Sequence, residues 1–286
     1  MKIKLLWLAA MVLAADANAA SYGPYPQETY QTCGASNASV AVELVHGGAW
    51  VSGDSSASRT QSLCQYLGAN GIYVLVVNYR LAETAPWPAQ LQDVQLGLRY
   101  LRAISIAKRV GVIGTSAGGH IALFMGETSG TIQFTTTDLI REASILKGVS
   151  DRPDFVVDVS GPTDLTDSKL LPKQVPFLIR GLGMNPLAAR AFTSPIAHLT
   201  SDIPPTLISH GAQDTTVPIG QSDEFVRAAG QAGISVTSVN SGSSHAVAAL
   251  SGITYDRHPG GHVFSVAPEV QSAMFRMIML FARGSQ

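Results

Sequence analysis

A serine flanked by glycines is the residue whose setting points most directly to chemistry. Ser116 stands in a Gly-x-Ser-x-Gly sequence between Gly114 and Gly118. A short apolar run ends at the first glycine, and an apolar run with the composition of a helix follows the serine. In the order strand, sharp turn, helix, such a serine projects its hydroxyl from the carboxyl edge of a sheet, where it can act as a nucleophile. The glycines leave room for the strained backbone of that turn.

A loop of small residues earlier in the chain could supply hydrogen-bond donors for the same chemistry. The sequence His46-Gly47-Gly48-Ala49-Trp50 follows the first strong apolar run. Attack on an ester carbonyl produces an oxyanion, which backbone N–H groups fixed in advance stabilise. We expect the N–H groups of Gly48, Ala49 and Ala117 to form this oxyanion hole. Gly47 either donates as well or only allows the loop to bend.

An acid and a histidine follow the serine in chain order, as a Ser-Asp-His triad on such a sheet requires. Asp214 comes after an apolar run and a turn, where a carboxylate can orient an imidazole and stabilise its charged form. Two histidines could be the general base, His245 and His262. We favour His245, because it lies on the loop that leaves 234–240, the last strand we expect, and a base must reach the serine oxygen. His262 is the alternative.

Strands and helices alternate along most of the chain. In the helix expected at 89–103, for example, four leucines and valines recur at helical spacing (Leu91, Val94, Leu98 and Leu101). The alternation predicts an α/β fold with a mostly parallel sheet and helices on both faces. Strands are expected at 40–45, 72–78, 110–114, 155–159, 205–210 and 234–240, and helices at 58–67, 89–103, 117–126, 221–230 and 270–282.

One region breaks this alternation. Residues 161–202 contain many apolar side chains without a regular strand and helix pattern. An apolar insertion on the edge where the serine emerges could cap a substrate pocket, or its helices could simply pack against the core. Residues 20–286, which include this region, are expected to form a single catalytic domain, since one α/β domain can use a chain of this length.

The N-terminal segment 1–19 has the composition of a secretory signal peptide. Lys2 and Lys4 precede an apolar run, and the small residues Ala17-Asn18-Ala19 suit a cleavage site. We therefore expect a secreted or periplasmic protein. Two cysteines, Cys33 and Cys64, then either form a disulfide or remain as buried thiols.

The composition narrows the range of partners. The net charge is −1 without basic runs, which argues against nucleic acid or an anionic membrane as partner. Two cysteines are too few for a metal cluster, and no His-Glu-x-x-His motif is present. The sequence implies neither a metal nor a cofactor, and it leaves the oligomeric state open.

Taken together, the motifs resemble those of the α/β-hydrolase-fold carboxylesterases. The resemblance rests on His-Gly-Gly-x-Trp ahead of Gly-x-Ser-x-Gly-Gly, with Asn78-Tyr79-Arg80-Leu81-Ala82 and Pro86-Trp87-Pro88-Ala89 between them. The sequence is similar to the hormone-sensitive-lipase-like, acetyl-xylan and feruloyl-esterase-like, and kynurenine-formamidase-like branches of this family. The resemblance spans nearly the whole mature chain. Around Asp214, His-Gly-x-x-Asp-x-x-Val-Pro fits the family acid, whereas Gly-His-x-Phe around His262 is the family-like histidine motif. Thr115 before the serine and Glu83 after Leu81-Ala82 depart from the lipase-like branch and favour the other two.

The resemblance implies a secreted serine carboxylesterase that acts on short-chain acyl or aryl esters, with a small-molecule or oligosaccharide ester as substrate. Its two-step acyl transfer would need no metal or cofactor. Two other readings stay open. The same scaffold also supports amidases, formamidases and lipases, and some proteins with this fold are non-catalytic binding proteins.

Overall fold

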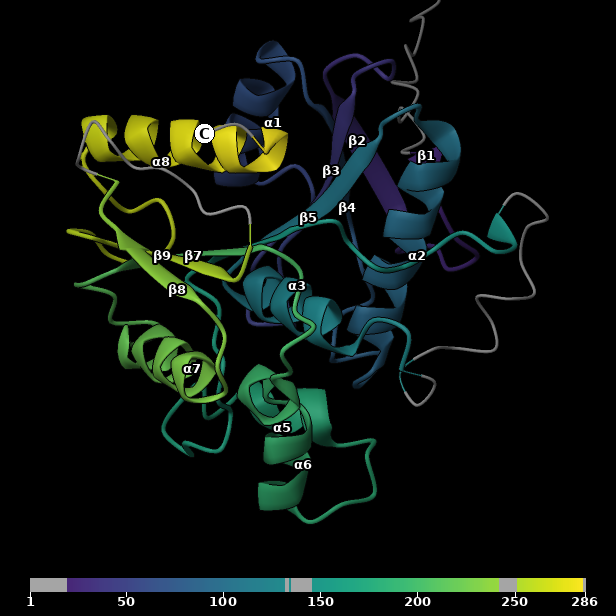
Figure 1. Ribbon diagram of the computed structural model, residues 1–286. Coiled ribbons are helices and arrows are strands. Elements are labelled where there is room, and N and C mark those ends of the chain that lie inside the picture. Colours follow the sequence, from purple (N-terminus) through teal and green to yellow (C-terminus); the bar gives the residue numbers. More distant parts are fainter. Residues whose placement is uncertain (1–19, 132–133, 135–145, 242–250, 285–286) are drawn as a thin grey trace, which may run out of the picture.

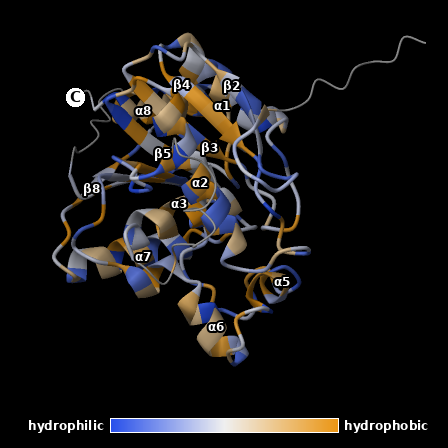
Figure 2. Ribbon diagram, turned by 90° about the vertical axis from the view of Figure 1, so that its right-hand side faces the viewer, coloured by the Kyte–Doolittle hydropathy of each residue, from blue (hydrophilic) through white to orange (hydrophobic). Residues whose placement is uncertain are grey.

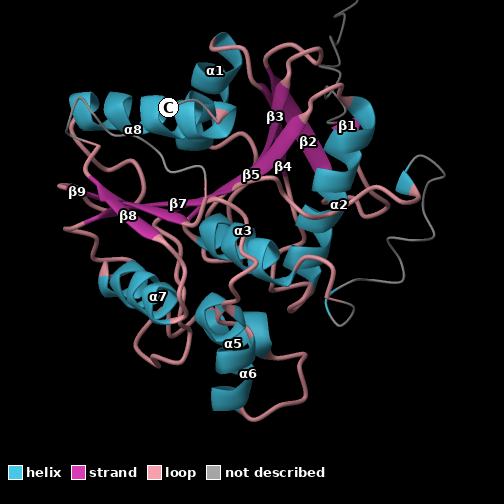
Figure 3. Cartoon of the chain, viewed as in Figure 1, coloured by secondary structure: helices cyan, strands magenta, loops and turns pink. Residues whose placement is uncertain are grey.

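A twisted central sheet organises the molecule. The computed structural model describes residues 20–131, 134, 146–241 and 251–284. Within these residues, nine strands form one sheet in the order β1-β2-β4-β3-β5-β6-β7-β9-β8 (Figures 1 and 3). The strands are β1 (Ala20–Ser21), β2 (Thr29–Cys33), β3 (Val40–Val45), β4 (Tyr73–Val77), β5 (Arg109–Thr115), β6 (Val156–Val159), β7 (Thr206–Gly211), β8 (Val236–Val239) and β9 (Ile253–His258).

Seven neighbouring strands, from β4 to β8, run parallel, and β1 and β2 add an antiparallel edge. Because β3 and β4 are buried along their whole length, both faces of the sheet must be covered. The helices are α1 (Ser58–Ala69), α2 (Ala89–Ile104), α3 (Ala117–Thr128), α5 (Val175–Ile179), α6 (Pro186–Phe192), α7 (Gly220–Gln231) and α8 (Pro268–Arg283), with a 3-10 turn at Pro195–His198.

The helices divide between the two faces of the sheet. Helices α1 and α8 pack on one face together, and α2, α3 and α7 lie on the other (Figure 1). Hydropathy colouring shows apolar strands between helices that turn polar residues outward (Figure 2). The expected α/β architecture with a mostly parallel sheet is therefore confirmed, and it is the α/β-hydrolase arrangement.

Every strand and helix expected from the sequence is present within a few residues. The short N-terminal strands and β9 were not anticipated. In β9, Asp256 and His258 are buried polar residues, so no continuous apolar run marks the strand. Asp256 accepts hydrogen bonds from the Ser209 hydroxyl and the Ser241 N–H, which offset the cost of burial. β9 lies between β7 and β8, and its place decides which loop reaches the site.

The region 161–202 combines the two roles left open by the sequence. Leu170, Val175 and Leu178 are buried in the main core. Leu171 and Gln174, next to them in the chain, instead line the cavity above the serine. Helices α5 and α6 project below α3 in Figure 1, beyond the carboxyl end of the parallel strands.

Cys33 at the end of β2 and Cys64 in α1 form a disulfide, so the structure selects the first of the two expected states. The bridge ties the antiparallel edge of the sheet to the helix that covers it. Residues 1–19, the expected signal peptide, lie outside the described residues. Within the described residues, no helix has both the length and the apolar character needed to span a bilayer.

Candidate active site

Ser116 occupies the sharp turn between β5 and α3 that its flanking glycines predict. Its φ is 54°, a left-handed value that a serine adopts only under constraint. A Cβ on Gly114 would lie 2.0 Å from the Gly118 oxygen, and one on Gly118 would lie 2.3 Å from the Val45 oxygen. The turn therefore tolerates no side chain on either side of the serine. The Ser116 N–H donates to the Val159 carbonyl at 2.8 Å, which fixes the turn to the next strand.

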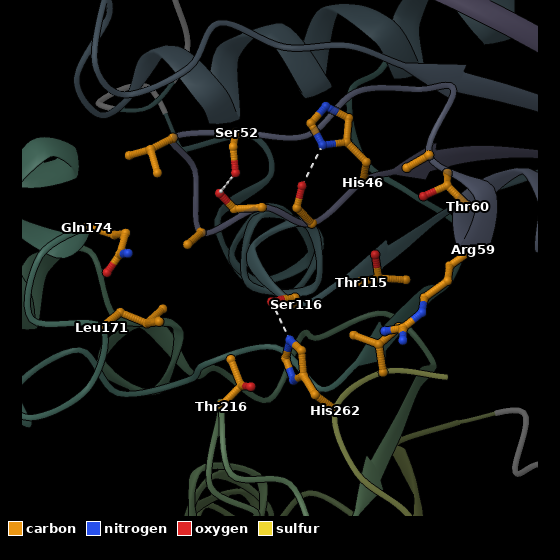
Figure 4. Close-up of a pocket in the computed structure, with 16 residues that line it drawn as sticks. His46, Ser52, Arg59, Thr60, Thr115, Ser116, Leu171, Gln174, Thr216 and His262 are labelled. Carbon is orange, nitrogen blue, oxygen red and sulfur yellow. Dashed lines mark hydrogen bonds between the residues drawn. The ribbon is translucent and has the colours of Figure 1, made fainter. Parts of the chain in front are cut away.

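His262 connects Ser116 to Asp214. Its Nε2 lies 2.9 Å from the Ser116 Oγ and its Nδ1 lies 2.7 Å from Oδ2 of Asp214 (Figure 4 shows the first contact). A carboxylate can only accept, so Nδ1 carries the proton and Nε2 is left free to accept the serine O–H. These three side chains form one continuous hydrogen-bonded series.

His245, the histidine favoured from the sequence, lies outside the described residues, and the geometry favours the alternative, His262. The expectation took 234–240 as the last parallel strand. That segment forms β8 at the edge of the sheet, whereas β9 inserts between it and β7. The principle that the base follows the last strand next to the acid holds, but that strand is β9.

The loops after β7 and β9 are joined to each other, and this brings acid and histidine together. The Ala212 N–H donates to the His258 carbonyl at 2.8 Å, and the Gln213 N–H donates to the Gly260 carbonyl at 2.7 Å. At Gly211 a Cβ would lie 2.4 Å from the Gly260 oxygen, so a glycine allows this close approach. Asp214 follows directly on one loop and His262 on the other.

Asp214 is held as a carboxylate by the groups around it. Its Oδ1 accepts the N–H groups of Thr216 and Val217 at 2.8 and 3.0 Å. Burial raises the pKa of Asp214, but hydrogen bonds from His210, His262 and the Val217 N–H outweigh burial and hold the pKa well below its usual range. The anion can therefore orient His262 and stabilise its protonated form.

His210 is a supporting residue that the sequence reasoning missed. Its Nε2 donates to the Val217 carbonyl at 2.9 Å and lies 3.3 Å from Oδ2 of Asp214, while its Nδ1 accepts the Ser222 hydroxyl at 2.7 Å. It is fully buried on β7. Its position four residues before Asp214, within the same strand-and-turn motif, was the available signal.

The loop before α1 presents backbone donors toward Ser116. Gly48 and Ala49 have φ values of 125° and 52°, and both line the cavity. The Gly48 carbonyl turns back into the loop, where it accepts the N–H groups of Val51 and Ser52 at 3.1 and 3.0 Å. No described residue accepts a hydrogen bond from the Gly48 or Ala49 N–H. These two groups are thus free to bind an oxyanion.

Two further expected residues of the oxyanion hole differ in role. Ala117 begins α3, so its N–H has no partner within the helix and points outward from the helix start. Gly47 matters for close approach, because a Cβ there would lie 2.9 Å from the Thr115 oxygen and 3.0 Å from the Ser116 Cβ. Its carbonyl accepts the His46 Nδ1–H at 2.7 Å.

The motif Asn78-Tyr79-Arg80 fixes this loop from below. The Tyr79 ring stacks on His46 at a centroid distance of 4.4 Å, and the Tyr79 hydroxyl donates to the His46 carbonyl at 3.1 Å. Burial lowers the pKa of His46, so this imidazole is neutral. His46 is therefore a structural residue of the loop.

Trp50 fixes the other side of the loop. Its indole N–H donates to the Nδ1 of His120 at 3.2 Å, and the Nε2 of His120 donates to the Thr193 carbonyl at 2.7 Å. Burial lowers the pKa of His120 to about 4, which keeps the ring neutral and able to accept. The chain of contacts links the oxyanion loop to α3 and to the insertion 161–202.

A cavity of about 490 Å³ opens over Ser116 and His262. Figure 4 shows Leu171 and Gln174 at one end, Arg59 and Thr60 at the other, and the serine–histidine pair between them. Within the described residues, no group of histidines, cysteines and carboxylates is arranged to hold a metal ion.

Comparison with known proteins agrees with this geometry. Residues 29–228 match the BD-FAE family model. Esterase LipC of Mycobacterium tuberculosis is 31% identical over 197 residues, which cover 64% of this chain and 46% of LipC. The carboxylic ester hydrolase LipM of the same organism is 27% identical over 194 residues, which cover 64% of this chain and 43% of LipM. The chain thus spans less than half the length of these two curated relatives.

Solved structures share the fold. A truncated carbohydrate esterase from gut microbiota superposes with a TM-score of 0.72 at 23% identity, covering 93% of this chain and 94% of that one. An acetyl ester-xyloside bifunctional hydrolase from Caldicellulosiruptor lactoaceticus gives 0.69 at 21% identity, with 90% and 88% covered. The fold and the serine turn are those of an α/β-hydrolase. The chain belongs to the BD-FAE family.

Behind the serine turn, Asp158 on β6 is fully buried. Its Oδ1 accepts the Gly161 N–H at 2.8 Å, and Gly119 of α3 passes so close that a Cβ there would lie 2.1 Å from this oxygen. Burial raises the pKa of Asp158 to about 6, although His210 and the Gly161 N–H lower it in part. The folded protein therefore holds this proton more tightly than the unfolded chain.

This proton makes folding pH-dependent. Between the ordinary pKa of 3.8 and the folded pKa of about 6, the folded state binds more protons, so stability falls as pH rises through that interval. Compared with Asp158→Asn, the wild type should lose about 2 kcal/mol of unfolding free energy from pH 4 to pH 6. Denaturant unfolding of both proteins at several pH values measures the difference. A difference that is constant across this range would contradict the prediction.

Proposed function

We propose that the protein is a serine carboxylesterase in which Ser116, His262 and Asp214 form the catalytic triad. The observation that carries the proposal is the hydrogen-bonded series from the Ser116 Oγ through the His262 imidazole to Asp214. Family membership and the esterase relatives support the reaction class. The N–H groups of Gly48, Ala49 and Ala117, which have no acceptor among the described residues, would bind the oxyanion.

The mechanism follows from these positions. The Nε2 of His262 takes the Ser116 proton while the serine oxygen attacks the ester carbonyl. The carbonyl oxygen becomes an anion held by the three N–H groups, a donor set in which one lost member costs about 3 kcal/mol. Protonated His262, stabilised by Asp214, gives its proton to the leaving alcohol. Water activated by the same nitrogen then hydrolyses the acyl-enzyme.

The size of the cavity supports a short acyl or aryl ester as substrate. Its volume of about 490 Å³ is near the lower end for small-molecule sites. Leu171 and Gln174 close one end, which limits the length of an acyl chain that fits beside Ser116. Among the proteins named above, one is a carbohydrate esterase and one is an acetyl ester-xyloside bifunctional hydrolase, and they support an oligosaccharide or small-molecule ester as the substrate here.

The choice between the two histidines gives a direct kinetic prediction. His262→Ala removes the proton acceptor, and kcat for 4-nitrophenyl acetate should fall by about 10⁴–10⁶-fold, as for other triad members. His245→Ala is the matched control and should retain kcat within about twofold. Thermal unfolding establishes that both variants are folded. Full activity of folded His262→Ala would refute the assignment.

We also propose that the protein is exported. The composition of residues 1–19 supports a signal peptide, and the Cys33–Cys64 disulfide is typical of proteins outside the reducing cytoplasm. Protein purified from the medium or periplasm of an expressing bacterium should begin at Ala20. Its intact mass should rise by about 2 Da when reducing agent opens the disulfide. Recovery only in the cytoplasm with residues 1–19 attached would contradict export.

A further inference from the structure

One end of the active-site cavity carries a positive charge that no described residue neutralises. Arg59, in the first turn of α1, is the single permanently charged residue among the sixteen that line the cavity. None of the described residues that line the cavity is an aspartate or a glutamate. Within the described residues, Arg59 makes neither an ion pair nor a side-chain hydrogen bond. Its guanidinium is therefore available to a ligand.

The neighbouring Thr60 adds a second group without a partner. Its side chain is buried, with the residue only 5% exposed, yet it lines the cavity. Its hydroxyl forms no hydrogen bond with any residue that the structure describes. Figure 4 shows Thr60 facing the cavity on the same side as Arg59. The hydroxyl is open to the cavity, where it can donate a hydrogen bond to a ligand atom.

The N-terminus of α1 also favours an anion at this end of the cavity. Ala57, the residue before the helix, lines the cavity, and no side chain caps the first-turn N–H groups. The first turn also contains no acidic residue. Uncapped N–H groups and the positive end of the helix dipole favour an anion. A guanidinium, a hydroxyl and a helix start thus surround one end of the cavity.

The anion that fits is a carboxylate. One guanidinium balances a single negative charge and can hold it with two parallel hydrogen bonds. A phosphate dianion would keep one charge uncompensated, because Arg59 is the single permanently charged residue among the described residues that line the cavity. The positive end also lies on the His262 side of Ser116, opposite Leu171 and Gln174 (Figure 4). Since His262 gives its proton to the leaving alcohol, the alcohol portion of the substrate lies at this end.

We propose that the preferred substrate is an ester whose alcohol portion carries a carboxylate, bound by Arg59 and Thr60 at the start of α1. The acyl group then lies toward Leu171 and Gln174. This assignment rests on the proposed esterase function and specifies its substrate class. It makes Arg59 a specificity-determining residue rather than a participant in bond breaking.

The test compares two esters that differ in charge. In 4-acetoxybenzoate the aryl alcohol carries a carboxylate, and in 4-acetoxybenzamide a neutral amide replaces it. The ratio of kcat/KM for the charged over the neutral ester, corrected for spontaneous hydrolysis, should exceed one. Arg59→Gln should lower this ratio about five- to tenfold, the range for a hydrated charge-assisted pair, and high salt should lower it in the wild type. Thr60→Val should lower it by a smaller factor.

Arg227→Gln is the matched control, because Arg227 is an exposed arginine of α7 that pairs with Glu224 and does not line the cavity. Its ratio should equal that of the wild type. A ratio unchanged by Arg59→Gln would overturn the proposal. The acyl side is tested with the mono-4-nitrophenyl ester of succinate against 4-nitrophenyl 4-methylpentanoate. A charge preference that depends on Arg59 only for this second pair would overturn the placement of the alcohol.

A binding measurement separates this inference from the esterase function itself. Calorimetry compares 4-hydroxybenzoate with 4-hydroxybenzamide on the full chain, without turnover. If neither ester is hydrolysed but the carboxylate binds more tightly and Arg59→Gln weakens it about fivefold, the esterase proposal fails and the carboxylate site stands. If the esters are hydrolysed and Arg59→Gln changes neither binding nor the ratio, the esterase stands and the carboxylate site is refuted.

Discussion

The hydrogen bond from His262 to Asp214 is the interaction on which the rest of the site depends. It fixes which imidazole nitrogen carries the proton, and so which nitrogen faces Ser116. Two loops from neighbouring parallel strands must end at the same height for it to form. The backbone bonds between the loops after β7 and β9 provide this alignment, and the buried His210 holds the carboxylate from behind. The contact between Ser116 and His262 therefore depends on the order of the loops at this edge of the sheet.

Several residues next to the Ser116–His262 pair have strained backbone conformations. Ser116, Ala49, Trp50 and Val263 all have left-handed φ values although none is a glycine. Such conformations cost on the order of 1–3 kcal/mol each, so the surrounding contacts must fix them. Trp50 is fully buried and bonded to His120, and Tyr79 stacks beneath the loop. The core thus fixes this loop before a substrate arrives, and oxyanion stabilisation requires donors that are fixed in advance.

Local patterns in the sequence predict most of this fold and two of the three side chains in the hydrogen-bonded series, Ser116 and Asp214. Apolar runs identify the buried strands, and β3 has the expected bounds, because strands covered on both faces need apolar side chains at every position. Ser116 and its glycines are recognisable because the turn excludes side chains. β9 could not be predicted in this way, because its buried residues Asp256 and His258 are polar. Asp256 is hydrogen-bonded to Ser209 and Ser241, which lie in other parts of the chain. Without that strand, the expectation placed the base at His245 after β8, whereas the geometry of the described residues favours the alternative, His262. Pairings such as Trp50 with His120 likewise depend on contacts that sequence spacing does not contain.

In the proposed mechanism the Ser116 hydroxyl is an activated nucleophile at the floor of the cavity. Reaction of the folded chain with a fluorophosphonate, followed by intact-mass and peptide mass spectrometry, tests this most directly. One adduct per chain is expected, located on Ser116. A folded protein that acquires no adduct, or that acquires it on another residue, would contradict the account.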